Sequence, residues 1–213
     1  MRGLLEKDLR LVFSKKQNLF FFCVIILFMG YAADRSFLIG YGAMLFGIWS
    51  VSTLSYDEFD NGMPFLMTLP ITVRDYVKEK FLFCGLAVVG GGFFSVVTGC
   101  LMAAVKGEPI WENNLLEIFG TVFIFVALLS IMIAVELKFG VEKSRTVLLI
   151  LGGAVFAVGM TVSNVLPENA LTREISVAEN QDALIFGILI GISVLVTLAA
   201  YFISCTIMKK KEF

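Results

Sequence analysis

One long apolar stretch sets the fold class of this chain: residues 81–105 read FLFCGLAVVGGGFFSVVTGCLMAAV and include no charged side chain. An α-helix rises about 1.5 Å per residue, so this stretch can cross the roughly 30 Å hydrocarbon core of a bilayer. Five other apolar runs are long enough to do the same. We therefore expect an all-α integral membrane protein with six transmembrane helices, at residues 17–33, 37–55, 81–105, 118–135, 146–166 and 183–208.

Composition leaves little room for anything besides a membrane domain. Of the 213 residues, 58% are hydrophobic and only 16% are charged, and the six predicted helices take up most of the chain. We expect a single transmembrane domain over residues 1–213, with an interfacial helix at 1–16 and cytoplasmic loops at 56–80 and 136–146. The lipid bilayer is its expected environment. No basic surface of the kind that binds nucleic acid is indicated.

The basic residues indicate how the chain is oriented. All but three of the 17 lysines and arginines fall on one side of the predicted spans, and the exceptions are Arg35, Lys106 and Arg173. Basic residues close to the ends of spans are retained in the cytoplasm. Both termini are therefore predicted to be cytoplasmic.

The predicted spans lack the groups that catalysis, proton transfer or metal binding require. No span has a charged residue in its interior, where insertion would cost roughly 2.5 to 3.5 kcal/mol. Histidine is absent, and the four cysteines lie within spans at no metal-ligand spacing, so no metal site is predicted. The chain also lacks the GxxxxGK[ST] phosphate-binding loop. We expect neither a catalytic site nor a cofactor in this chain.

Small residues are concentrated in the third and fifth predicted spans, notably at Gly90, Gly91, Gly92, Gly153 and Ala157. Small side chains let helices approach closely in lipid. Packing within the chain is one interpretation, and a dimer interface or a moving gate is the other. The glycine triplet also lowers helix propensity by about 1 kcal/mol per residue, which makes it a candidate hinge.

The N-terminal segment has the pattern of an interfacial helix. Leu5, Leu9, Val12 and Phe13 recur at helical spacing and share one face, while charged residues occupy the other. We expect this helix to lie along the cytoplasmic membrane surface.

The loop at 56–80, YDEFDNGMPFLMTLPITVRDYVKEK, mixes charged and large apolar side chains and is longer than a simple connector. Its acidic opening, which includes Asp57 and Glu58, favours a helix N-terminus. Pro64 and Pro70 interrupt any continuous helix, so two short helices with a bend between them are expected.

The second of these helices is predicted over residues 72–80, with Thr72 as its N-cap and Asp75 completing a capping box, and it should continue into the third span.

The loop at 136–146, ELKFGVEKSRT, contains a Phe139-Gly140 turn followed by charged residues. A charged loop that follows the positive-inside rule is one interpretation of it, and a second docking element is the other.

Taken together, the two loops resemble those of ABC type-2 transporter permeases. The branch they look like comprises small, half-size bacterial export permeases, including the membrane subunits of phenol-soluble modulin and bacteriocin-type peptide exporters. In the first loop, the resemblance rests on an acidic, asparagine-containing opening, an LMTLPI run and the residues after it: Glu58, Asn61, Gly62, residues 66–71, Arg74, Tyr76 and Lys80. Residues 138–145, KFGVEKSR, are similar to the second loop of that branch.

The resemblance implies a location in the inner membrane of a bacterial cell, a function and a set of partners. The first loop would form a coupling helix in a groove of a separate ABC ATP-binding subunit, which would hold the ATP and Mg²⁺. Two permease copies, expected as a homodimer, would pair with two such subunits to export amphipathic or apolar substrates such as peptides or drugs. The implied contact residues are Glu58, Asn61, Gly62, Leu66, Leu69, Pro70, Arg74, Phe139, Gly140, Lys143 and Arg145.

Two other functions fit the same residues. A non-transport assembly or sensor module could dock a cytoplasmic partner through residues 56–80. A membrane enzyme is the third hypothesis, and the missing acid, base and metal ligands weigh against it.

Overall fold

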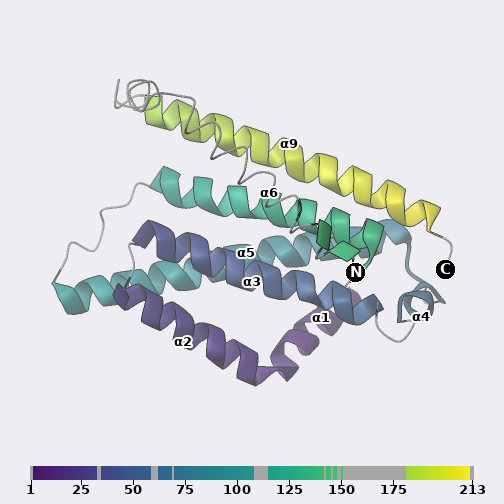
Figure 1. The fold of residues 1–213 in the computed structure, drawn as a ribbon, viewed down its shortest axis with the longest axis horizontal. Coiled ribbons are helices and arrows are strands. Elements are labelled where there is room, and N and C mark those ends of the chain that lie inside the picture. Colours follow the sequence, from purple (N-terminus) through teal and green to yellow (C-terminus); the bar gives the residue numbers. More distant parts are fainter. Residues whose placement is uncertain are drawn as a thin grey trace.

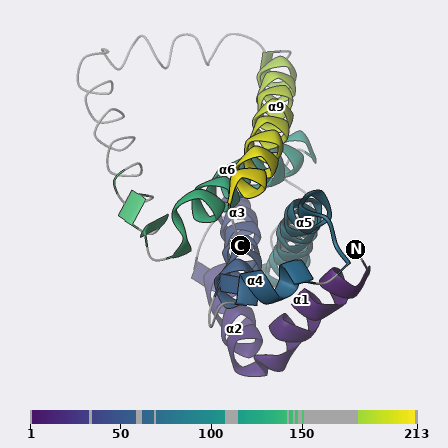
Figure 2. The ribbon, with the colours of Figure 1, turned by 90° about the vertical axis from the view of Figure 1, so that its right-hand side faces the viewer.

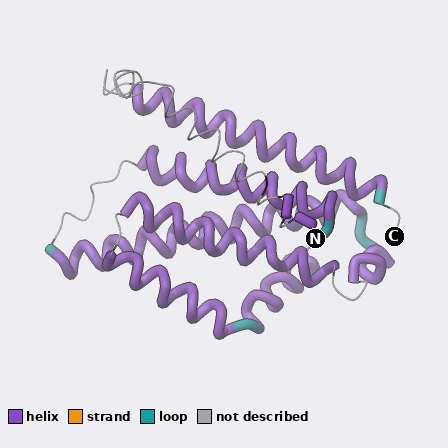
Figure 3. Tube along the Cα trace, in the orientation of Figure 1, coloured by secondary structure: helices purple, strands orange, loops and turns teal. Residues whose placement is uncertain are grey.

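The computed structural model describes residues 2–32, 35–58, 62–68, 70–107, 115–141, 143–144, 146–147, 150 and 181–211, and within them every regular element is an α-helix (Figure 3). The helices are α1 (Arg2–Ser14), α2 (Lys16–Ala32), α3 (Arg35–Glu58), α4 (Gly62–Thr68), α5 (Val73–Lys106), α6 (Leu115–Phe139) and α9 (Gln181–Lys210). The predicted all-α class is confirmed for these residues.

Four of the helices, α3, α5, α6 and α9, are each long and apolar enough to cross a membrane. The 17-residue α2 matches the predicted first span, but it passes the same test only together with α1, from which it is bent by 72°. The predicted span at 146–166 lies almost wholly outside the described residues. The described structure therefore supports four spans, or five if the bent pair is one, and not the full six.

The helices form a layered bundle. The antiparallel helices α3 and α5 pack at the centre, α6 packs on them and α9 packs on α6 (Figure 1). The α1–α2 pair covers the opposite side and meets in an elbow that projects away from α6 and α9 (Figure 2). One end of the bundle is formed by the start of α1, the short helix α4 and the C-terminal ends of α6 and α9, and it is called the α4 end from here on.

Close approach of α3 and α5 depends on glycine. A Cβ atom at Gly91 would lie 2.5 Å from the backbone oxygen of Gly42, and one at Gly42 would lie 1.8 Å from Ser95 Oγ. At Gly92 it would lie 3.2 Å from Val122 Cγ2 of α6, whereas at Gly90 it would meet nothing within 4 Å. Helix α5 continues unbroken through the triplet, so Gly91 and Gly92 are packing residues within the chain. Gly153 and Ala157 lie outside the described residues.

The start of α5 is built as the sequence predicts. The Asp75 N–H donates to Thr72 Oγ1 at 3.2 Å, and the Thr72 N–H donates to Asp75 Oδ2 at 3.4 Å, so both halves of the capping box form. The helix then runs without a break from Val73 to Lys106. The predicted first short helix is α4, and Pro64 lies in its first turn, where proline is tolerated, instead of interrupting it.

The expected acidic helix start, at Asp57, Glu58 and Asp60, is wrong for the first two residues, and Asp60 lies outside the described residues. Asp57 and Glu58 are the last residues of α3, so they end a spanning helix and do not begin a new one. The sequence pattern misled because carboxylates are favoured at helix N-termini, and here contacts from other helices override that preference.

We predict that Gly91→Ala destabilises the protein by about 1 to 3 kcal/mol, because the added methyl forces α3 and α5 apart. The matched Gly90→Ala variant should be neutral or stabilise by up to about 1 kcal/mol, since it only raises helix propensity. Thermal unfolding in detergent would compare the two. Equal behaviour of both variants would mean that the α3–α5 contact does not limit stability.

Candidate functional site at the α4 end

The two carboxylates at the end of α3 require partners from elsewhere in the fold. The C-terminal end of a helix carries partial negative charge, so it disfavours acidic side chains by about 0.3 to 1 kcal/mol each. Asp57 is 6% exposed, which removes water as a compensating partner. Each of the two carboxylates is instead held by residues far away in the sequence.

Asp57 belongs to a buried ionic cluster that joins α1, α3 and α5. Its carboxylate forms ion pairs with Lys7 and, at 2.7 Å, with Lys80, and it accepts a hydrogen bond from the Tyr76 hydroxyl at 3.0 Å. Lys80 also pairs with Asp8, which is fully buried. The ammonium group of Lys80, itself 3% exposed, thus lies between two carboxylates from two different helices.

Further contacts complete this cluster. Thr53 of α3 donates its hydroxyl hydrogen to Asp8 at 3.0 Å, and Lys7 Nζ lies 3.2 Å from the other Asp8 oxygen. Two cations therefore pair with two carboxylates, of which Asp8, Asp57 and Lys80 are buried and Lys7 is partly exposed. The ionic cluster, as named from here on, comprises Lys7, Asp8, Thr53, Asp57, Tyr76 and Lys80.

Glu79 lies beside the ionic cluster and is 1% exposed. Neither of its carboxylate oxygens has a hydrogen-bond partner among the described residues. Burial is the largest influence on this group and disfavours its ionised form, as do the nearby carboxylates, whereas the charges of Lys80 and Lys7 favour it. This buried carboxyl group was not predicted from the sequence. The available signal was helical spacing, since Glu79 and Lys80 lie one turn before the buried Phe83 and Cys84.

Glu58 connects the two loops of the α4 end. Its Oε2 accepts a hydrogen bond from the Val141 N–H at 2.8 Å, and Lys211 Nζ lies 3.4 Å from its Oε1. Gly140, between α6 and Val141, has a positive φ of 77°, and a Cβ there would lie 3.2 Å from Glu58 Oε1. A glycine at this turn thus allows the close approach of Glu58 to the second loop.

Helix α4 packs on the bundle through one face and exposes the other. Met63 and Leu66 are buried, at 6% and 8% exposure, and belong to the protein's own core. Phe65 points the other way and is 68% exposed. Leu66, expected as a partner contact, therefore anchors α4 to the bundle, and Phe65, which was not among the predicted residues, is the large apolar side chain on the open face.

The other predicted contact residues divide into three groups. Pro70, Arg74, Phe139 and Lys143 are exposed at the α4 end. Gly62, the first residue of α4, and Gly140, at the turn after α6, are half-buried, and Glu58 is engaged within the chain. Asn61, Leu69 and Arg145 lie outside the described residues.

Among the described residues, no group of three or more His, Cys, Asp or Glu side chains is placed to hold a metal ion. The α4 end exposes an aromatic side chain on a short helix, together with the basic side chains of Arg74 and Lys143 and the apolar side chain of Phe139, and it contains the buried ionic cluster.

Membrane-length helices whose loops carry a packed short helix at one end define a multi-pass membrane protein. The family model described as ABC-2 family transporter protein matches residues 3–209, and the chain belongs to this family. It is accordingly the membrane component of an ABC transporter, and the family implies a separate ABC ATP-binding subunit as its partner. Comparisons with curated proteins and with solved structures each gave no match.

We predict that Lys80→Met destabilises the protein by about 3 to 5 kcal/mol, because it leaves Asp8 and Asp57 buried without their shared cation. The control is Lys78→Met, at an exposed position on the same helix, which should change stability by no more than about 0.5 kcal/mol. Thermal unfolding in detergent measures both. A Lys80→Met protein as stable as its control would show that the ionic cluster does not hold the three helices together.

Proposed function

We propose that this protein is the membrane subunit of an ATP-driven exporter of amphipathic or apolar substrates, such as peptides or drugs. The proposal places it in a bacterial inner membrane with both termini in the cytoplasm, as the distribution of basic residues indicates. The observation that carries the proposal is α4, a short helix packed on the bundle by Met63 and Leu66 with Phe65 exposed. Membership of the ABC-2 family supports it.

In this proposal the ATP-binding subunit docks on the open face of α4 and on the second loop. Phe65 is the central apolar contact, since a few large side chains supply most of the affinity of an interface. The remaining contacts are Asn61, Gly62, Leu69, Pro70, Arg74, Phe139, Lys143 and Arg145. ATP and Mg²⁺ bind in the partner subunit, and this chain performs no bond chemistry.

The contacts inside the chain suggest how motion at α4 reaches the membrane. Met63 and Leu66 pass a displacement of α4 to the core. The ionic cluster ties the ends of α3 and α5 to α1, so these helices move together. Glu58 couples the start of the first loop to the second loop through Val141. A push from the ATP-binding subunit therefore acts on the whole α4 end, which is what alternating access requires.

We also propose a homodimer, on the strength of the resemblance in the two loops. The described part of α9 exposes large apolar side chains such as Ile188, Leu195 and Phe202 within its membrane-length stretch. Such a surface suits either lipid or a second copy of the chain.

We predict that Phe65→Ala weakens binding of the ATP-binding subunit by about 1 kcal/mol or more, without a comparable loss of stability. The matched variant Leu66→Ala should instead lower stability by about 2 to 5 kcal/mol, because it leaves a cavity in the core. Complex retention during purification, substrate-stimulated ATP hydrolysis and thermal unfolding are measured for both. Unchanged retention and hydrolysis in Phe65→Ala would make α4 a connector. A stable complex without substrate-stimulated hydrolysis would favour the assembly or sensor function.

Glu58 offers a separate test of coupling. We predict that Glu58→Ala reduces substrate-stimulated ATP hydrolysis and transport but leaves binding of the ATP-binding subunit largely intact, because it releases the Val141 N–H and separates the two loops. Glu58→Gln keeps an acceptor oxygen for that N–H and should restore part of the activity. If Glu58→Ala abolishes binding and Glu58→Gln does not rescue it, Glu58 is a direct contact with the partner.

A further inference from the structure

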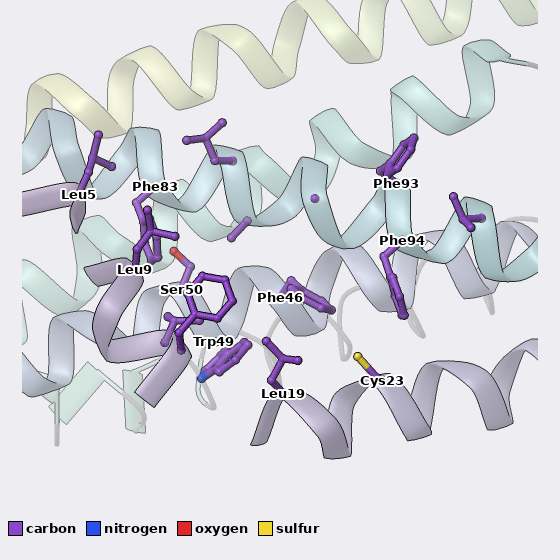
Figure 4. Close-up of a pocket in the computed structure, with 16 residues that line it drawn as sticks. Leu5, Leu9, Leu19, Cys23, Phe46, Trp49, Ser50, Phe83, Phe93 and Phe94 are labelled. Atoms are coloured by element: carbon purple, nitrogen blue, oxygen red, sulfur yellow. The ribbon is translucent and has the colours of Figure 1, made fainter. Parts of the chain in front are cut away.

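An apolar groove lies between the bent α1–α2 pair and the α3–α5 pair (Figure 4). Its volume is about 650 Å³, within the range of small-molecule binding sites. Aromatic rings from three sides line it, including Trp49 and Phe46 of α3 and Phe83 and Phe93 of α5, and none of its lining side chains is charged.

The amphipathic face of α1 forms one side of this groove. The four residues that share the apolar face, Leu5, Leu9, Val12 and Phe13, all line it. Leu9 and Phe13 remain 45% and 58% exposed, so this face is not closed by the described protein. Water in contact with such an apolar lining is unfavourable, and the acyl chains of the adjacent bilayer are apolar molecules that could fill the groove instead.

We propose that the groove binds one acyl chain of an anionic phospholipid, taken from the membrane leaflet next to the α1–α2 elbow. The headgroup lies at the elbow, where Lys15 and Lys16 fall between the groove residues Phe13 and Leu19. Lys15 is engaged by the Tyr56 hydroxyl and lies 4.1 Å from the centre of its ring. Lys16 is exposed and has no ion pair or hydrogen-bonding side-chain partner among the described residues, so its charge is available to an anionic headgroup.

The chemistry of the lining favours an acyl chain over an extended peptide. A peptide backbone carries a donor and an acceptor at nearly every residue, and burying them without partners costs free energy. The groove offers few polar groups, chiefly Ser50 and the indole N–H of Trp49. An alkyl chain needs none. The site does not depend on the proposed export function, since a lipid bound here would also hold the elbow against α3 and α5.

A photoreactive lipid tests the proposal. The purified protein in detergent is mixed with a small amount of phosphatidylglycerol that carries a diazirine in one acyl chain, irradiated and mapped by mass spectrometry. We expect the label at Leu9, Phe13 and Phe93, well above the level at Leu195 and Phe202, which are exposed on α9. Equal labelling of the α9 residues and the groove residues would overturn the site.

Filling the groove provides the matched comparison. Gly90 lines the groove and a Cβ there meets nothing within 4 Å, so Gly90→Leu should fold and should lose most of the groove label. Gly85 is equally open and lies on the same helix, but it does not line the groove, so Gly85→Leu should keep the label. Ala87→Leu is a second groove-filling variant, used if Gly90→Leu does not fold. Retention of the label in a folded groove-filling variant would contradict the proposal.

The headgroup is tested by competition. Unlabelled phosphatidylglycerol should displace the label at lower concentration than phosphatidylcholine, and Lys16→Gln should remove this difference. Lys78→Gln, an exposed lysine on α5, should preserve it. If the two lipids compete equally with the unaltered protein, or if Lys16→Gln behaves like Lys78→Gln, the assignment to an anionic lipid held by Lys16 is wrong.

Discussion

The buried ammonium group of Lys80 organises the α4 end of this protein. It belongs to α5 and lies between Asp8 of α1 and Asp57 of α3, so this one ammonium group links three helices. A charge buried alone costs several kcal/mol, and each of these groups becomes tolerable only when the others are present. The ionic cluster therefore favours one position of α1 on the bundle, in addition to any stability that it contributes. Lys7 adds a second, partly exposed cation that pairs with both Asp8 and Asp57.

The elements around the ionic cluster follow from this constraint. Helix α1 is tied to α3 and α5 at the cluster and is bent by 72° from α2, and the apolar groove lies between this bent pair and the α3–α5 pair. Helix α4 follows directly after the Asp57–Glu58 pair and packs on the same end. Glu58 extends the connection to the second loop. The two loops of the α4 end thus rest on helices that are fixed to one another.

Several elements of the fold could be predicted from the sequence, and their common property is that they are local. The membrane helices α3, α5, α6 and α9 were predicted because apolar length is a property of continuous sequence. The capping box at Thr72 depends on residues three positions apart. The apolar face of α1 was predicted from helical spacing, although the groove that it lines was not. The six-span count remains a prediction, since residues 151–180 lie outside the described structure.

The candidate site was less predictable, because burial decides what its residues do. Leu66 and Phe65 are neighbours of similar character, and only the packing of α4 shows that one anchors the helix and the other is exposed. Asp57 and Glu58 suggested a helix start, but partners more than 40 residues away, Lys7 and Val141, hold them at a helix end. By itself the sequence determined the helical membrane class, because in lipid the backbone must satisfy its own hydrogen bonds. Only the tertiary structure decided which charges are buried together and which face of each helix remains open, because those outcomes depend on residues that are distant along the chain.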